Sequence, residues 1–175
     1  MENIEKKKNM KIENLSHSYR VVRFDGSDAE AVFSLYQTNP QYFDAMGDIP
    51  TLESAKADLI ALPPNKAIED KYYVGFYDEA HLVAIMDLIR GFPNEQTAFI
   101  GLFMVHASQQ GRGIGSKIIA DVLSHLKSLG FSRCRLGYVK TNLQSKSFWF
   151  KNGFLPTGVE SKQEKYTIVL MEKEI

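Results

Sequence analysis

The alternation of apolar and polar positions predicts helices and strands in a mixed order along the chain. Apolar residues at helical spacing predict helices, and runs rich in β-branched and aromatic residues predict strands. The order is βααβββαβαββ, an α/β fold with an antiparallel front half and one βαβ crossover. The predicted helices cover residues 28–38, 51–62, 114–129 and 142–151, and the predicted strands cover 19–24, 72–77, 82–89, 97–105, 132–139, 154–158 and 166–171.

Length, composition and charge restrict the class of protein. With 175 residues, 44% of them hydrophobic and 24% charged, the chain is typical of a soluble globular protein with one domain. We expect residues 1–16 to form a mobile leader and residues 17–175 to form that domain. The formal net charge of +0 gives no general attraction to nucleic acid or to an anionic membrane, so neither is expected as a partner.

The N-terminus and the single cysteine narrow the cellular setting. Residues 1–11 are charged and lack the apolar segment of a signal peptide, and no apolar run has the length of a membrane span. A cytoplasmic location is therefore expected. With Cys134 as its single cysteine, the chain can form neither an internal disulfide nor a cysteine-based metal cluster, and no metal is expected.

A glycine-rich stretch between a predicted strand and the longest predicted helix is the strongest candidate for a binding site. Residues 110–116 read Gln-Gly-Arg-Gly-Ile-Gly-Ser. The glycines let the backbone approach a ligand with no Cβ in the way. The helix that begins there directs unpaired N–H groups and the positive end of its dipole toward the loop. This arrangement favours an anion, most often a phosphate.

Two common phosphate-binding motifs do not fit this stretch. A P-loop requires lysine directly after its last glycine, whereas Gly115 is followed by Ser116 and only then by Lys117. A dinucleotide fingerprint requires a glycine where Ser116 stands. It also requires an acidic residue about 20 positions further on, where residues 133–135 read Arg-Cys-Arg. Residue identity therefore excludes both nucleotide-binding motifs.

A third pattern, Gln/Arg-x-x-Gly-x-Gly/Ala, is matched at every fixed position by Gln110, Gly113 and Gly115. Further on, residues 142–154 read Asn-Leu-Gln-Ser-Lys-Ser-Phe-Trp-Phe-Lys-Asn-Gly-Phe. With these two blocks the chain resembles the GNAT superfamily of acetyl-CoA-dependent N-acetyltransferases, whose second signature is Asn followed by Phe-Tyr-x-Lys-x-Gly-Phe. The order of elements over residues 19–172 also agrees. The resemblance implies a mixed, mostly antiparallel sheet of six to seven strands with helices on both faces.

The resemblance implies acetyl-CoA as the co-substrate. In the family the glycine loop binds the pyrophosphate of CoA, and the strand before it offers main-chain groups to the pantetheine arm. The asparagine that opens the second helix meets the same arm. Asn142 can also be a plain helix N-cap, and Lys151 a solvated lysine at a helix end. The implied CoA-binding residues are Phe103, Met104, Val105, Gln110, Gly111, Arg112, Gly113, Ile114, Gly115, Ser116, Asn142, Ser145, Phe148, Trp149 and Lys151.

The implied reaction is direct attack of a neutral amine on the thioester, which calls for a base and for a proton donor to the leaving thiolate. The signature usually offers a tyrosine as the acid, but Trp149 stands there, and an indole N–H has no useful acidity. Tyr138 is the candidate acid. Asp87, which interrupts the apolar run 82–89, and His106, an imidazole just past the predicted strand 97–105, are candidate bases. Each has a structural alternative, as a strand tyrosine, an outward-facing carboxylate and a surface histidine.

The acceptor is not readable from the sequence beyond being a small-molecule or protein amine. The resemblance implies that residues 37–48 and 159–165 wall its site, and Tyr42 and Phe43 are candidate contacts, with a place in the core as their alternative. An edge strand near the C-terminus would allow a homodimer. The alternative function is a non-catalytic CoA-binding or regulatory module on the same fold, for which Trp149 in place of tyrosine is the main support.

Overall fold

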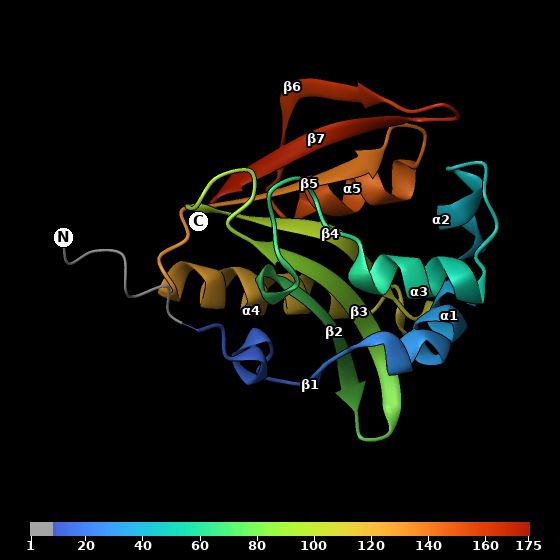
Figure 1. Ribbon diagram of the computed structural model, residues 1–175, viewed down its shortest axis with the longest axis horizontal. Coiled ribbons are helices and arrows are strands. Elements are labelled where there is room, and N and C mark those ends of the chain that lie inside the picture. Colours follow the sequence, from blue (N-terminus) through green and yellow to red (C-terminus); the bar gives the residue numbers. More distant parts are fainter. Residues whose placement is uncertain (1–8) are drawn as a thin grey trace.

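The computed structural model describes residues 9–175, which form a seven-stranded sheet with helices on both faces (Figure 1). The strand order is β1-β2-β3-β4-β5-β7-β6. Neighbouring strands are antiparallel except β4 and β5, which are parallel. The mixed, mostly antiparallel sheet is therefore confirmed. The strands are β1 (Arg20–Arg23), β2 (Lys71–Asp78), β3 (His81–Arg90), β4 (Thr97–Val105), β5 (Arg133–Val139), β6 (Leu155–Lys162) and β7 (Thr167–Glu174).

The α-helices lie where the apolar spacing predicts them, with one addition. Helix α2 occupies part of residues 41–48, which the sequence predicts as a loop. Pro40 stands in its first turn, where the fixed φ of proline suits a helix and the missing N–H costs little. The helices are α1 (Ala29–Gln37), α2 (Pro40–Asp44), α3 (Leu52–Ile60), α4 (Ile114–Ser128) and α5 (Leu143–Lys151), with 3-10 turns η1 (Ile12–Leu15), η2 (Gly26–Asp28), η3 (Ile68–Asp70) and η4 (Ala107–Gln109).

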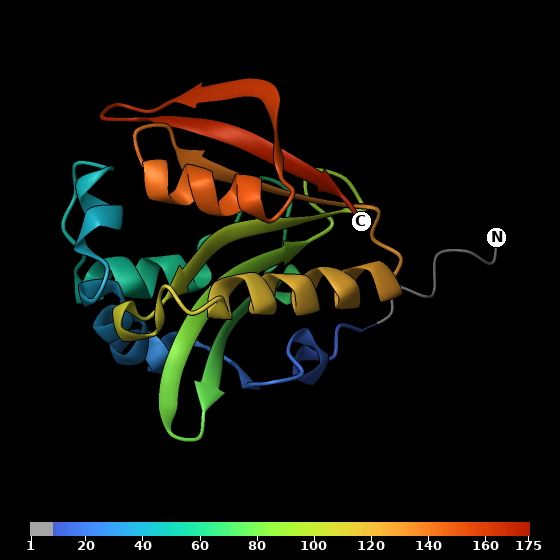
Figure 2. The same cartoon turned by 180° about the vertical axis from the view of Figure 1, so that it is seen from behind.

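Each face of the sheet carries its own hydrophobic core. Along β2, Tyr72, Val74 and Phe76 belong to the core beneath α4 and α5, whereas Tyr73 belongs to the core beneath α1 and α3. This alternation is the period of two of a strand that is buried on both faces. Figure 1 shows α3 on the near face of the sheet, and Figure 2 shows α4 and α5 together on the opposite face. The predicted apolar stripe of α4 is buried at Ile118, Ile119, Val122, Leu123 and Leu126.

Packing against the domain begins before residue 17. Residues 1–8 of the predicted mobile leader lie outside the described residues, but residues 10–16 pack against the domain. Met10 and Leu15 are 7% and 0% exposed and join the core beneath α4. Just after them, the backbone N–H of His17 donates to Asp121 Oδ2 at 3.0 Å. Apolar side chains among the charges therefore fill space beside α4 within the segment that the sequence predicts as a leader.

The C-terminal hairpin differs from the prediction in length. The sequence predicts a polar turn over residues 159–165, but β6 continues to Lys162. Nearly all of β6 is exposed, because it is the edge strand of the sheet. An exposed edge strand needs no apolar alternation, so its polar residues resemble a turn. The bulge between Pro156 and Glu160, where Gly158 has φ +89°, hides the pattern further.

Candidate functional site

Strands β4 and β5 separate part-way along their length. Their pairing joins residues 97–100 of β4 to residues 133–136 of β5, although β4 continues to Val105 and β5 to Val139. The register between β3 and β4 shifts at the same level, beside Gly101. A β-bulge bends its strand and increases the local twist, so β4 turns away from β5 there. We call the space between residues 101–105 and 137–139 the wedge.

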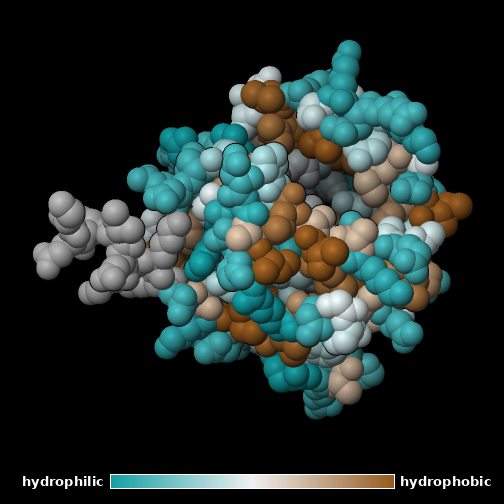
Figure 3. All heavy atoms as spheres, in the orientation of Figure 1, coloured by the Kyte–Doolittle hydropathy of each residue, from teal (hydrophilic) through white to brown (hydrophobic). Residues whose placement is uncertain are grey.

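A cavity of about 300 Å³ lies at the open end of the wedge. It is lined by the end of β4, the glycine loop (residues 110–116), α5 and the start of α2. Every predicted CoA-binding residue except Arg112 is among the lining residues. Figure 3 shows the surface hollowed over β4, between the β6–β7 hairpin and α3. The structure thus brings together two sequence blocks that lie about 30 residues apart.

Glycine is needed at the positions of the loop for two different structural reasons. Gly111 and Gly113 have φ +78° and +76°, a conformation that side chains rarely adopt. Gly115 has ordinary φ, but a Cβ there would come within 3.1 Å of the Phe148 ring. Gly113 is also the N-cap of α4, and it has no side chain to cap the helix. The first N–H groups of α4 therefore have no side-chain cap, and uncapped groups of this kind can bind an anion.

An aromatic wall from β4 and α5 forms the opposite side of the cavity. Phe148 stacks on Phe103 with ring centroids 5.9 Å apart, and Trp149 meets Phe148 edge-on at 4.9 Å. At the start of α5, Asn142 accepts a hydrogen bond from the Ser145 N–H at 3.1 Å, so its role as N-cap is present. The wall offers apolar contact area to a ligand arm, with no acid at position 149.

Four amide side chains that the sequence does not single out by residue line the cavity. They are Asn39, Gln41, Gln109 and Gln144. Gln110 Nε2 donates to Asn39 Oδ1 at 2.7 Å, across 71 positions of sequence. No local pattern marks such a contact, because Asn39 followed by proline reads as a plain helix end. The contact exists because the fold places the end of α1 beside the end of β4.

The two predicted acceptor contacts separate in the structure. Tyr42 lines the cavity, whereas Phe43 is 6% exposed and packs against Tyr36 in the core beneath α1 and α3. Successive residues of a helix point about 100° apart, so one of the pair faces the cavity and the other the core. Burial raises the pKa of Tyr42, with Asp58 and Tyr166 adding to the effect, and keeps its phenol neutral.

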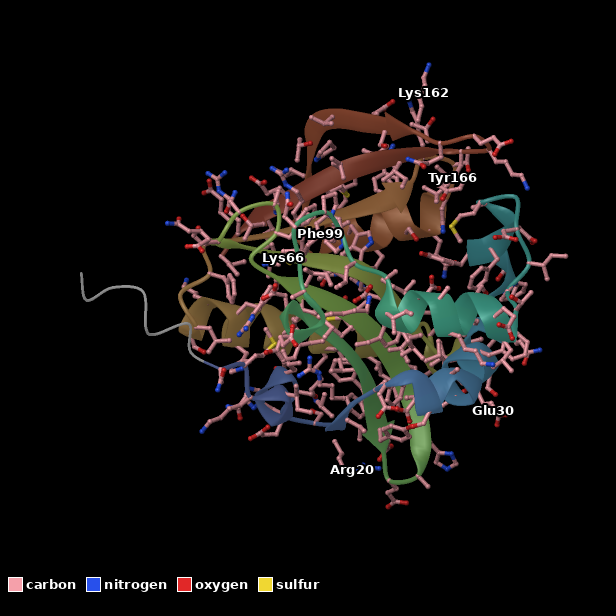
Figure 4. The ribbon with its side chains drawn as sticks, in the orientation of Figure 1. Arg20, Glu30, Lys66, Phe99, Lys162 and Tyr166 are labelled. Carbon is pink, nitrogen blue, oxygen red and sulfur yellow. The ribbon has the colours of Figure 1, made fainter. Side chains whose placement is uncertain are left out.

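The segments that the resemblance implies as acceptor walls touch each other. Lys165 Nζ, at the tip of the β6–β7 hairpin, donates to the carbonyl of Gly47 at 3.4 Å. Gly47 follows α2, so the hairpin tip meets the loop between α2 and α3. Figure 4 shows Tyr166 beneath β7, on the side toward α2. The contact joins residues 37–48 to residues 159–165 beside the hollow.

Asp87 forms an ion pair with a lysine and does not line the cavity. Its Oδ2 lies 2.8 Å from Lys71 Nζ, which also donates to the carbonyl of Ala61 at 2.8 Å. Burial raises the pKa of Asp87, and the charge and hydrogen bond of Lys71 act in the opposite direction. A raised pKa suits a base, but Asp87 is not among the lining residues of the cavity. Its role as base stays a prediction.

A second cluster of buried polar side chains lies beneath α1 and α3. The Tyr36 hydroxyl donates to Asp58 Oδ2 at 2.7 Å and lies 3.0 Å from the Tyr73 hydroxyl. Burial raises the pKa of Asp58, while the hydrogen bond from Tyr36 and the charge of Lys71 lower it. The face beneath α1 and α3 thus contains two carboxylates that are partly removed from water.

Tyr138 and His106 also lie away from the lining of the cavity. Tyr138 is buried in the core beneath α4 and α5, and burial raises its pKa. His106 is the N-cap of η4, where its Nδ1 accepts from the Ser108 N–H at 3.1 Å. It lines another cavity together with His81, near the β2–β3 hairpin. Their catalytic roles stay predictions that this geometry does not support.

The cavity lining is poor in groups that exchange protons. Among the described lining residues, the titratable side chains are Tyr42 and Lys151. Within residues 9–175, no three His, Cys, Asp or Glu side chains gather in a way that could hold a metal ion. In the same residues no helix is long and apolar enough to cross a membrane. The chemistry of the site therefore centres on backbone groups, amides and aromatic rings.

Comparisons with known proteins agree with this geometry. The profile of the acetyltransferase (GNAT) family matches residues 30–154. No curated protein sequence gives a significant match.

Solved structures resemble the chain over nearly its whole length. An acetyltransferase from Thermus thermophilus is 21% identical with a TM-score of 0.73, covering 90% of this chain and 97% of that one. An acetyltransferase of Salmonella typhimurium, described as modifying the N-terminal serine of 50S ribosomal subunit protein L7/L12, is 17% identical with a TM-score of 0.72, over 92% and 97%. RimL, a ribosomal L7/L12 α-N-protein acetyltransferase in complex with coenzyme A, is 16% identical with a TM-score of 0.70, over 94% and 98%. At these identities the likeness shows the fold.

Proposed function

Because the chain belongs to the acetyltransferase (GNAT) family, we propose that it transfers an acetyl group from acetyl-CoA to a primary amine by direct attack on the thioester. One observation carries the proposal. The uncapped N-terminus of α4 and the unpaired end of β4 face the same cavity of about 300 Å³. An anion site beside a free strand edge suits a ligand with a pyrophosphate and an amide-containing arm.

The described residues divide the proposed ligand between them. The N–H groups of residues 113–116 receive the pyrophosphate at the helix N-terminus, where the dipole favours negative charge. The pantetheine arm lies along β4 between Phe103 and Val105, as an added strand would. Phe103 and Phe148 cover its apolar part, and Trp149 closes the wall behind them. Arg112 contributes charge from outside the lining.

The proposed reaction balances without an acid on α5. The amine nitrogen forms a bond to the thioester carbon, and collapse of the adduct breaks the C–S bond and releases the thiolate. A thiol with a pKa of about 8.5, as for cysteine, leaves tolerably as its anion. Tyr42 stays a neutral phenol and donates a hydrogen bond to the acceptor or to the departing sulfur. The proton that the amine loses passes to water.

The acceptor class follows less directly. Two of the similar structures are described as acetylating the N-terminus of a ribosomal protein, which supports a protein amine as the acceptor here. The opening toward α2 and the β6–β7 hairpin is compatible with a chain terminus or with a small amine. A cytoplasmic setting and a homodimer through the exposed edge of β6 stay predictions.

A ligand panel tests the cofactor first. Thermal unfolding is measured with acetyl-CoA, CoA, ATP and NAD, each at about 100-fold above a Kd of micromolar order, where binding adds about 2.7 kcal/mol of stability. We expect a rise in Tm with acetyl-CoA and with CoA, and no rise with ATP or NAD. Stabilisation by ATP or NAD but by neither CoA compound would contradict the proposal. An amine panel then follows release of free thiol with a peptide N-terminus, lysine, amino acids and small amines.

The second candidate is a CoA-binding module without catalysis. Trp149 and the absence of carboxylate and imidazole among the described lining residues favour it. The two functions share the ligand and differ in turnover. Stabilisation by CoA without thiol release from acetyl-CoA, over the whole amine panel, supports the module. Thiol release that depends on one class of amine supports the transferase and identifies its acceptor.

A further inference from the structure

The carbonyl of Val105 is the last acceptor on the edge of β4 that faces the wedge. The N–H of the next residue, His106, donates to the carbonyl of Val83 on β3 at 2.8 Å. Successive residues of a strand direct their backbone groups to opposite edges. The N–H and carbonyl of Val105, and likewise those of Phe103, therefore point away from β3 and into the wedge.

Two amide side chains already occupy this carbonyl. Gln110 Nε2 donates to Val105 O at 2.9 Å, and Asn39 Nδ2 donates to it at 3.1 Å. A carbonyl oxygen has two lone pairs, so its accepting capacity is filled. Gln110 Nε2 also donates to Asn39 Oδ1 at 2.7 Å, which closes a triangle of the three groups.

The triangle connects elements that are distant in sequence. Asn39 Nδ2 donates to Thr38 Oγ1 at 3.0 Å, and this hydroxyl accepts from the Ala107 N–H at 3.2 Å. On the other side, Gln144 Nε2 at the start of α5 lies 3.4 Å from Gln110 Oε1. Pro40, the next residue along the chain, begins α2 and so the wall that carries Tyr42. Asn39 thus touches β4, the glycine loop and the acceptor side together.

We propose that Asn39 is a positioning residue that holds the glycine loop and the end of β4 in the geometry that binds CoA. The proposal rests on the proposed function, because the site that Asn39 positions is the CoA site. With the Val105 carbonyl filled, the pantetheine arm pairs with the backbone groups of Phe103 and with the Val105 N–H. Asn39 thereby determines where this backbone pairing ends, and it fixes the glycine loop relative to the acceptor wall.

Two substitutions separate hydrogen bonding from packing. Asn39→Asp keeps the size and the acceptor for Gln110 but replaces the donor to Val105 O by a charged oxygen. We expect Asn39→Asp to weaken CoA binding about tenfold at neutral pH and Asn39→Ala about fivefold, since one hydrogen bond is worth about 1 kcal/mol and repulsion adds to its loss. Trp149, the single tryptophan, lines the cavity, so its emission reports CoA binding.

Acid should rescue the aspartate variant. As the pH falls toward about 4, close to the ordinary pKa of aspartate, a large share of the introduced carboxyl protonates and regains a donor for Val105 O, so its CoA affinity should approach that of the wild type measured at the same pH. A packing role gives the reverse order, with Asn39→Asp close to wild type, Asn39→Ala weaker and no rescue, and that result would overturn the proposal.

A matched control and a double-mutant cycle complete the test. Asn14→Ala removes an exposed amide in η1, far from the cavity, and should leave CoA affinity unchanged. The effects of Asn39→Ala and Gln110→Ala should not add, because the two side chains share one network; additive effects would count against it. Circular dichroism verifies that each variant is folded. A wild-type protein that binds no CoA overturns the proposed function together with this inference, whereas unchanged binding by Asn39→Asp overturns the inference alone.

Discussion

The two faces of the sheet carry different chemistry. Helices α4 and α5, with the glycine loop and the end of β4, bring backbone N–H groups, three glycines and aromatic rings, all within residues 103–116 and 142–149. The face beneath α1 and α3 holds polar side chains from separate elements, including the buried pair of Lys71 and Asp87 and the hydrogen-bonded pair of Tyr36 and Asp58, all outside the cavity lining. The face with α4 and α5 can bind an anionic ligand through its local backbone geometry. On the face beneath α1 and α3, the polar side chains come from separate elements and are brought together by the fold.

This difference explains why only the backbone-built half of the site can be predicted from the sequence. A backbone site needs glycine at particular φ values, and such positions leave a short motif in the sequence. Gly111 and Gly113 meet that need directly. A site made of side chains needs partners brought together by the fold, such as Asn39 and Gln110. The following experiments test whether the faces differ in energetics as well.

The largest effect is expected from breaking the buried ion pair on the α1–α3 face. Lys71 is 2% exposed, and Lys71→Met leaves Asp87 buried without its partner. Removal of one member of such a pair costs about 3–5 kcal/mol of unfolding free energy, because the remaining charge stays desolvated. Urea denaturation followed by circular dichroism measures the loss.

An exposed pair on the same face is the control for this experiment. Lys56→Met breaks the contact with Glu53 on α3, where the side chains are 52% and 82% exposed. Water and salt screen that pair, so its loss should cost less than about 1 kcal/mol. Equal losses for Lys56→Met and Lys71→Met would mean that the buried pair has no special weight in this face.

The second effect separates the two ends of α4. Gly113→Ala and Gly130→Ala each place a side chain at positive φ, at +76° and +93°, and neither Cβ would meet an atom within 4 Å. Each should therefore cost about 1–2 kcal/mol of stability. Only Gly113→Ala changes the loop at the helix N-terminus, so we expect it to weaken CoA binding at least about tenfold by titration calorimetry. Similar CoA affinities for the two variants would contradict an anion site there.

Much of the fold could be predicted because its signals are local. The run over residues 97–105 and the stripe that begins at Ile114 match β4 and the start of α4. The predicted elements differ from the structure where the sequence pattern does not follow the burial of the side chains. Helix α2 begins at Pro40 in a segment too short for periodicity, and the edge strand β6 is too exposed to alternate. Residues 10–16 pack on α4 although their charged neighbours suggest a loose leader.

The site was predictable up to the point where the fold brings distant side chains together. The glycine loop and α5 carry the motif, and the predicted residues from both line one cavity. Phe43 turns into the core, because helix geometry separates it from Tyr42 by about 100°. Asn39 and Gln144 enter the cavity through contacts with Gln110 that span the chain. Such contacts leave no periodic trace in one sequence.

A smaller effect concerns pH and Asp58. Burial raises its pKa, so the folded state holds the proton more tightly than the unfolded state does. Its contribution to stability is therefore present below the ordinary pKa of aspartate and is lost as the pH rises through the raised value. Asp58→Asn keeps an acceptor for Tyr36 without the charge. We expect the variant to gain stability relative to wild type as the pH rises over this window, as measured by urea denaturation at several pH values. A constant difference between the two proteins would show that Asp58 titrates normally.

The smallest effect is expected for turnover by Asp87→Asn. The carboxylate is bound to Lys71 and lies outside the cavity lining, so the substitution should lower the unfolding free energy but change kcat/KM by less than about threefold for the folded protein. The measurement uses thiol release with the acceptor found in the panel, at a temperature where both proteins are fully folded. A general base contributes about 100-fold or more to rate. A loss of that size, with unchanged CoA affinity, would establish Asp87 as the base and would move acid–base catalysis to the α1–α3 face.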